Sequence, residues 1–443
     1  MKHAIFDLVA LALLLAGLAR FEARGERVPR SLRIGWVVAF AALALFGAWN
    51  LLRIALANVA RPPLWDFKVF WMVGRVAVSG GDVYDPASYT PFAAALNPGH
   101  DPLFTAVALG VGLPYPPPVL ALFFPLGRWD LVTALKLWYV AMFVALALAA
   151  LLLWRQFFAR AGAAGALTAA LLLLLLPQTG ATFALAQINV FALCLLLAYW
   201  RETVPWRAGL WLAPLGLMRP PAFALALANL ARGRRTLFAT LAASLALLFV
   251  AAVPLAGPRA MATYVRANPS GHYPESFFAG YQSLYELFAR SDAGRGGYFS
   301  LAAHPAYLLC AGLLLACAAG LALRAAPERE SMVRGSLLAL GLFIYPSTGP
   351  HYALLLLVPL CDVWLRREEL GIGTIGAIAA FELNYALLRV GDASATIGLL
   401  LCLDAAFFAL LALRAPRRDR RYVAARGAST PRYRVGTGEA LRR

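Results

Sequence analysis

A single carboxylate stands among aromatic residues directly after a long apolar run. Asp66 lies between Trp65 and Phe67, shortly after the apolar residues 34–56. Because tryptophan and other aromatic side chains settle at the boundary between membrane and water, the pattern predicts that the carboxylate is held at that depth. Two interpretations follow: a general base, or a solvated residue of an interfacial helix that its aromatic side chains only anchor.

Basic and proline-rich positions interrupt other apolar segments. Arg219 precedes Pro220 and Pro221, between the short apolar segments 208–218 and 220–230. A cation inside membrane segments is costly and therefore suggests function, and a guanidinium matches the geometry of a phosphate. The alternative is that the side chain snorkels to the lipid head groups. Tyr115 stands in a similar setting, within a run of prolines.

Amides, a histidine and a tyrosine occur beside two further turns. Gln187 and Asn189 follow a polar turn, where they could bond neighbouring helices or the hydroxyls of a sugar. His351 begins an apolar segment after Pro-Ser-Thr-Gly-Pro. It is a candidate phosphate ligand or proton shuttle, or simply a residue that pairs with a carbonyl. Tyr352 could add a hydroxyl to the same site.

The composition predicts a polytopic all-α membrane protein. Of 443 residues, 61% are hydrophobic and only 14% charged, whereas soluble proteins have about 45–50% and about 25%. The net charge of +18 comes mostly from short loops and the C-terminal tail, which fits the positive-inside rule and anionic lipid head groups rather than nucleic acid. The five cysteines have no metal-ligand spacing with histidine, so neither zinc nor a disulfide framework is indicated.

The hydropathy pattern predicts a single membrane domain over residues 1–414 with about 11–13 spans. Two long outer loops cover about 58–112 and 256–304, and residues 415–443 form a basic cytoplasmic tail that we expect to be disordered. The proline-rich segment 113–126 is too short for an ordinary span. We expect a re-entrant or broken helix there, which is tolerated only where protein or a water-filled cavity covers it.

Because successive spans cross the membrane in alternating directions, counting them places the polar motifs on one side of the membrane. Asp66, Tyr115, Gln187, Arg219 and His351 all come out on the outer face, where chance would scatter them over both faces. We therefore expect one cavity. A nucleotide substrate is not supported, because the chain has no Walker A loop and no Asp-x-Asp pair.

Taken in order, these motifs resemble glycosyltransferase family 87 over roughly residues 34–365. They are the aromatic-Asp-aromatic segment at Asp66, Gly-Gly-Asp-Val-Tyr-Asp-Pro at 80–86, Tyr-Pro-Pro at Tyr115, Gln187-x-Asn189, and Arg219-Pro-Pro. The family consists of integral-membrane enzymes of the GT-C type that use polyprenyl-phosphate mannose, including α-1,2-mannosyltransferases of glycolipid assembly. Its members usually have lysine before Pro-Pro, where this chain has Arg219.

The resemblance implies a multi-pass hexosyltransferase of the cell (plasma or inner) membrane with its active site on the non-cytoplasmic side. It would move a sugar, with mannose expected, from a polyprenyl-phosphate donor to a glycolipid or glycan acceptor with inversion and without metal or cofactor. Asp66 matches the catalytic carboxylate of the first outer loop. The expected contacts to donor phosphate and substrate come from Arg219, His351, Lys68, Arg75, Tyr115, Gln187, Asn189 and Tyr352. The alternative is a lipid-linked sugar flippase or binding protein, in which Asp66 and Arg219 form a gating pair.

Overall fold

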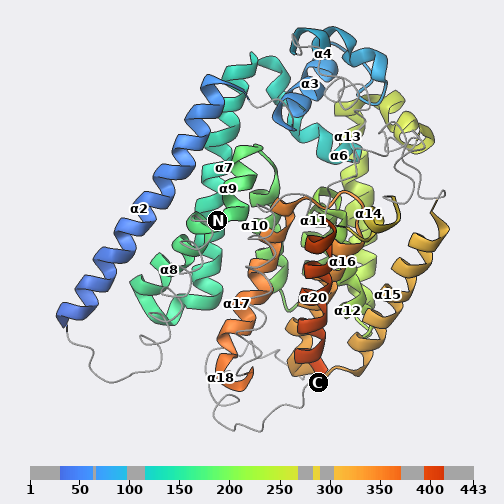
Figure 1. The fold of residues 1–443 in the computed structure, drawn as a ribbon. Helices are drawn as coiled ribbons and strands as arrows, with labels where there is room; N and C mark the ends of the chain where they lie inside the picture. Colours follow the sequence, from blue (N-terminus) through green and yellow to red (C-terminus); the bar gives the residue numbers. More distant parts are fainter. Residues whose placement is uncertain are drawn as a thin grey trace, which may run out of the picture. The chain divides into compact units, whose positions relative to one another are not determined.

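The computed structural model describes residues 30–62, 66–96, 115–267, 283–289, 304–370 and 394–413 (Figure 1). Every regular element in these residues is a helix, as predicted. The α-helices are α2 (Arg30–Ala60), α3 (Asp66–Val78), α4 (Thr90–Leu96), α6 (Pro117–Leu120), α7 (Leu131–Leu153), α8 (Gly162–Leu175), α9 (Pro177–Ala184), α10 (Asn189–Arg201), α11 (Pro205–Met218), α12 (Leu225–Leu230), α13 (Arg235–Ala267), α14 (Leu284–Ala289), α15 (Pro305–Arg324), α16 (Glu330–Ile344), α17 (Leu357–Leu365), α18 (Arg367–Leu370) and α20 (Ser394–Leu413). The predicted tail 415–443 lies outside the described residues.

Four helical stretches among the described residues are long and apolar enough to cross a membrane: Ile34–Ala60, Leu131–Leu175, Arg235–Arg266 and Pro305–Arg324. The second contains 45 residues, which would extend about 67 Å as one helix, twice the thickness of a bilayer core. It doubles back instead at Gly162, whose φ is +56°, so that α7 and α8 pack against each other. These two helices match the spans expected from hydropathy.

Four shorter apolar helices accompany these long ones among the described residues. They cover Asn189–Arg201, Pro220–Leu230, His351–Leu365 and Leu401–Leu413. Each is too short to cross alone in a straight path, and the second begins at a proline. They explain why the span count predicted from hydropathy carries a range.

The proline-rich segment forms a broken helix, as its sequence predicts. α6 passes into the 3-10 helix η2 (Ala121–Arg128), which ends before Asp130 caps the start of α7. η2 packs closely on α3, because a Cβ at Gly127 would come within 2.0 Å of the backbone of Gly74. Only glycine at both positions allows this approach of the two backbones, and it fixes the helix that begins with Asp66.

The two predicted outer loops contain helices that the hydropathy did not indicate. α3, the 3-10 helix η1 (Pro86–Tyr89) and α4 lie within the first loop, and together with α6 they occupy one end of the bundle (Figure 1). In the second loop α13 continues past the predicted boundary to Ala267, with a kink at Gly257 (φ +82°). Gly257 has non-helical φ and ψ, so α13 consists of two helices that meet at this kink; glycine adopts the positive φ without steric cost.

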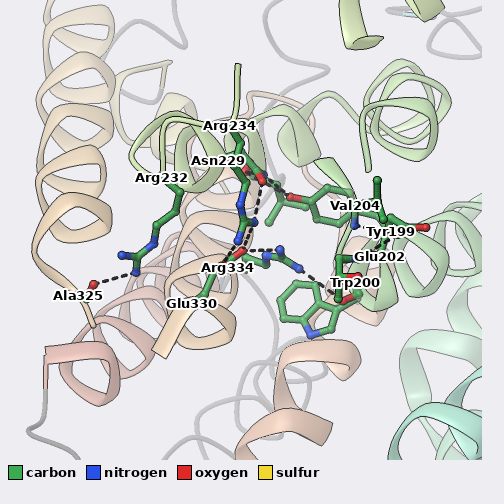
Figure 2. Close-up of polar contacts among 12 residues, drawn as sticks. Tyr199, Trp200, Glu202, Val204, Asn229, Arg232, Arg234, Ala325, Glu330 and Arg334 are labelled. Carbon is green, nitrogen blue, oxygen red and sulfur yellow. Dashed lines mark hydrogen bonds and ion pairs between the residues drawn. The ribbon is translucent and has the colours of Figure 1, made fainter. Parts of the chain in front are cut away.

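A cluster of charged and aromatic side chains lies at the opposite end of α10 from Asn189 (Figure 2). Both Nη atoms of Arg234 donate to the two carboxylate oxygens of Glu330, at 2.7 and 2.8 Å. Arg334 donates to the same carboxylate and lies 5.2 Å from the ring centre of Tyr199. Trp200 donates to Asp362 at 2.8 Å. This inner cluster joins α10, α12, α16 and α17, and α10 also carries Asn189 of the site described below.

We expect Glu330→Gln to lower the free energy of unfolding by about 2–3 kcal/mol, because it leaves two partly buried guanidinium groups without a carboxylate. Burial opposes the ionised form, but Arg334 and Arg234 together hold the pKa of Glu330 below its ordinary value. The carboxylate therefore stabilises the fold above the pKa of the unfolded chain and loses this effect as the pH falls through the folded pKa. Melting temperatures in detergent should thus differ between wild type and variant at neutral pH and converge in acid.

The matched control is Glu328→Gln, the same change at an exposed position two residues earlier. It should melt as the wild type does. A Glu330→Gln protein with the wild-type melting temperature at neutral pH would show that the inner cluster does not stabilise the fold.

Candidate active site

Arg219 is buried at a break between two helices. α11 ends at Met218, and Arg219 has non-helical φ and ψ of −139° and 87°, since the residue before a proline is disfavoured in the α conformation. The chain resumes as the 3-10 helix η5 (Pro220–Ala224). A Cβ at Gly341 of α16 would come within 2.4 Å of the Pro221 carbonyl. The prolines and the glycine therefore fix this turn inside the bundle, where Arg219 is fully buried.

Neutral oxygen atoms accept the hydrogen bonds of the Arg219 guanidinium. Nε donates to Asn189 Oδ1 at 2.5 Å, and Nη2 donates to Gln187 Oε1 at 3.0 Å. Nη1 faces three oxygens: Tyr115 OH (2.6 Å), Tyr352 OH (3.2 Å) and the Met218 carbonyl (3.2 Å). The predicted residues 115, 187, 189, 219 and 352 thus meet in one cluster. Because these acceptors carry no charge, the positive potential of the buried cation acts on its surroundings.

Gln187 and Asn189 are placed by the end of α9. The N–H groups of Ala186 and Gln187 donate to the carbonyls of Phe183 and Thr182, at 3.1 and 2.9 Å, the pattern of a Schellman motif. Ala186 takes the left-handed position with φ +52°, where glycine is usual. This turn sets Gln187 and the start of α10 against Arg219.

Asp66 begins α3 and belongs to the same cluster. The side chain of Gln187 and the charge of Arg219 both act on its carboxyl group. Burial raises the pKa of the Asp66 carboxyl above its ordinary value, and the Gln187 hydrogen bond and the Arg219 charge act in the opposite direction. A carboxyl with a raised pKa near a cation is the arrangement expected of a group that exchanges protons.

Aromatic packing holds α3 in this place. The ring of Phe70 stacks on that of Phe123 with 4.2 Å between centroids and meets Tyr115 edge-on at 6.0 Å. Phe67, next to Asp66, is fully buried and contacts Trp138. The helix that carries the carboxylate is therefore fixed to α6, η2 and α7 rather than lying loosely at an interface.

His351 lies at the start of the 3-10 helix η11 (Pro350–Leu356) and is also buried. Its carbonyl accepts a hydrogen bond from Asn189 Nδ2 at 3.2 Å, and its ring meets that of Tyr352 at 4.9 Å. It lies in the field of Arg219. Among the described residues, neither ring nitrogen has a hydrogen-bond partner. A buried polar side chain of this kind calls for an explanation, and a bound ligand is one.

Lys68 and Arg75 make other contacts, although both stand on α3. Lys68 Nζ donates to the carbonyl of Leu96 at 3.3 Å. Arg75 donates to the Gly127 carbonyl at 3.1 Å and lies over the ring of Trp71. These contacts attach α3 to α4 and η2, so the geometry does not bring the two cations into the Arg219 cluster.

The structure adds residues that sequence reasoning did not assign to the site. Tyr84, from the Gly-Gly-Asp-Val-Tyr segment, donates to the carbonyl of Tyr115 at 2.9 Å. Asp82 of the same segment accepts from Thr263 of α13 at 2.8 Å. Tyr345 interacts electrostatically with Arg219 and Tyr115. The recurrence of tyrosine beside turns was the available signal, but no spacing links these residues to Arg219.

The described residues contain no group of three or more histidine, cysteine, aspartate or glutamate side chains that could hold a metal ion. The cluster offers instead one carboxylate, one buried guanidinium, one imidazole and several amides and hydroxyls. It can accept a proton at Asp66, stabilise negative charge near Arg219, and donate or accept hydrogen bonds at His351.

The fold and the site define a helical membrane protein with a buried polar site of the kind that enzymes use. A sequence model of glycosyltransferase family 87 matches residues 113–359, more than half of the chain. The chain belongs to this family, which confirms the predicted resemblance, and it is accordingly a membrane glycosyltransferase. No curated protein and no solved structure matches it.

The matched residues contain most of the cluster but not all of it. Tyr115, Gln187, Arg219 and His351 lie within the match, whereas Asp66 precedes it. What links Asp66 to the matched residues is therefore the effect of Gln187 on its carboxyl and the packing of α3 against η2.

Proposed function

We propose that the protein transfers a sugar, with mannose expected, from a polyprenyl-phosphate donor to a glycolipid or glycan acceptor. The reaction takes place on the non-cytoplasmic side of the cell membrane, and Asp66 is its general base. The observation that carries this proposal is the link from Asp66 through Gln187 to the fully buried Arg219. A base, a cation and an imidazole with open nitrogens meet at one place in a membrane-embedded bundle.

The chemistry is a single displacement. Asp66 takes the proton of an acceptor hydroxyl while that oxygen attacks the anomeric carbon of the sugar. The bond from the anomeric carbon to the phosphate oxygen breaks, and polyprenyl phosphate leaves with the bonding electrons. Attack from the face opposite the leaving group inverts the anomeric configuration. Because the leaving group is already a phosphate, the step needs no nucleotide.

The site residues divide these tasks. The raised pKa of Asp66 makes its carboxylate a stronger base than an exposed aspartate. Arg219 favours the negative charge of the departing phosphate by its potential, since its own hydrogen bonds are already accepted by neutral groups. His351 has the open hydrogen-bonding atoms and is the residue we assign to direct contact with the donor phosphate. Tyr115 and Tyr352 place their hydroxyl groups beside the same guanidinium.

The test uses the purified full chain in lipid vesicles with synthetic polyprenyl-phosphate mannose and a glycolipid acceptor. We expect mannosylated lipid and an equal amount of polyprenyl phosphate, with polyprenyl-phosphate glucose as the parallel donor. If only the glucose donor were hydrolysed or used for transfer, the proposed sugar would be glucose instead of mannose. Movement of intact donor between leaflets without any transfer would favour the flippase and contradict the proposal.

A further inference from the structure

The Gln187 side chain lies between the candidate base and the buried cation. Its amide oxygen accepts from Arg219 Nη2 at 3.0 Å, and its side chain also acts on the Asp66 carboxyl, favouring the ionised form. An ionised carboxylate only accepts hydrogen bonds, so the amide nitrogen is the donor to Asp66. Both ends of this one amide are therefore engaged within the protein.

The backbone that carries Gln187 is held unusually firmly. Ala186 is fully buried with φ +52°, a conformation that costs an alanine free energy and persists only where the surroundings enforce it. Its carbonyl accepts from Trp138 Nε1 at 2.8 Å, while Gln187 N–H donates to Thr182 at 2.9 Å. The strained backbone of Ala186 directly precedes Gln187, which indicates that the position of the Gln187 side chain is important for the site.

The charges around Asp66 give this geometry a consequence. Besides Asp66, the charged and titratable groups of the cluster and of α3 are Arg219, His351, Tyr115, Tyr345, Tyr352, Lys68 and Arg75. Of the described residues, Gln187 and Arg219 are the ones that act on the Asp66 carboxyl. Arg219 polarises the Gln187 amide through its oxygen, and the amide nitrogen consequently donates a stronger hydrogen bond to the carboxylate.

We infer that Gln187 is a positioning residue for the proposed reaction: it connects Arg219 to Asp66 and fixes the carboxylate in its reactive orientation, instead of binding the sugar. The inference rests on the proposed function for its catalytic meaning. The Gln187 contact itself is a property of the folded protein and can be measured without substrate. Its loss removes a donor to the charged form, which raises the pKa of Asp66 further.

The test compares wild type, Gln187→Leu and Gln187→Glu in the mannose-transfer assay between pH 5 and 9. We expect kcat to fall by up to about 100-fold, KM for the donor to stay near the wild-type value, and the acid limb of the pH profile of kcat to move to higher pH. Gln156→Leu is the matched control, because it makes the same change in the π-helix that follows α7. It should leave kcat and the pH profile unchanged.

A second readout does not need activity. Dicyclohexylcarbodiimide modifies protonated carboxyl groups in apolar surroundings, and mass spectrometry can follow its adduct on Asp66 against pH. In both Gln187 variants the labelling of Asp66 should persist to higher pH than in wild type. The near-isosteric Gln187→Glu keeps an acceptor for Arg219, so it serves if Gln187→Leu does not fold.

The outcomes distinguish a failure of the Gln187 inference from a failure of the proposed function. Unchanged labelling and an unchanged pH profile, with KM raised, would make Gln187 a substrate-binding residue and overturn the inference. Shifted labelling in a protein whose wild type transfers no sugar would support the Gln187 contact and contradict the proposed function.

Discussion

Asp66→Asn is expected to lower sugar transfer by about 10²- to 10⁴-fold, the usual contribution of a general base. Asparagine has nearly the same shape and can still contact Gln187, but it cannot take a proton from the acceptor. The measurement is kcat for mannose transfer in vesicles. KM for the donor should change little, because the carboxylate acts on the acceptor hydroxyl and not on the lipid phosphate.

Asp130→Asn is the control for this substitution. Asp130 is exposed and caps α7 through hydrogen bonds from the backbone of Val132 and Thr133, a role that asparagine fills equally well. Its activity should equal that of the wild type. If Asp66→Asn lost only a few-fold in kcat while folding normally, Asp66 would not be the base.

The wild-type pH profile follows from the same residue. Because burial raises the pKa of Asp66, the carboxyl remains protonated at pH values where an exposed aspartate is already ionised. Activity should therefore fall as the pH drops through this raised pKa and be retained above it. An acid limb at the position typical of an exposed aspartate would show that burial does not tune the base.

Much of this site was predictable because membranes penalise polar groups. Asp66 and Arg219 attract attention in the sequence because a charge inside or beside an apolar segment is expensive. The proline pairs mark the broken helices, since proline removes a backbone donor. The helical class follows from the requirement that backbone groups be satisfied within the segment.

The distances within the site were not predictable. Arg219 meets Tyr115 and Tyr352, which lie 104 and 133 residues away in the chain, and a spacing in sequence carries no information on such contacts. The sequence left two interpretations of Gln187, bonds to neighbouring helices or to a sugar, and could not foresee that its amide oxygen accepts from Arg219. The left-handed Ala186 also carries no sequence signal, because alanine is common in helices.

Arg219 offers the second large effect, and its substitutions separate charge from hydrogen-bond geometry. Arg219→Met removes a buried cation and leaves several buried oxygens without a donor, each costing about 1–3 kcal/mol. We expect transfer to fall by about 10³-fold, of the size seen when a preorganised electrostatic group is lost, together with a lower melting temperature. Arg219→Lys keeps the charge but has only three donors on a flexible stem.

The activity of Arg219→Lys should therefore lie between that of the wild type and that of Arg219→Met, with kcat reduced by about 10- to 100-fold. Arg266→Met, at an exposed position in the last turn of α13, is the control for loss of a positive charge and should transfer at the wild-type rate. If Arg219→Lys and Arg219→Met lost activity equally, the fork geometry alone would matter. If Arg219→Met folded and transferred sugar normally, the buried cation would have no part in stabilising the departing phosphate.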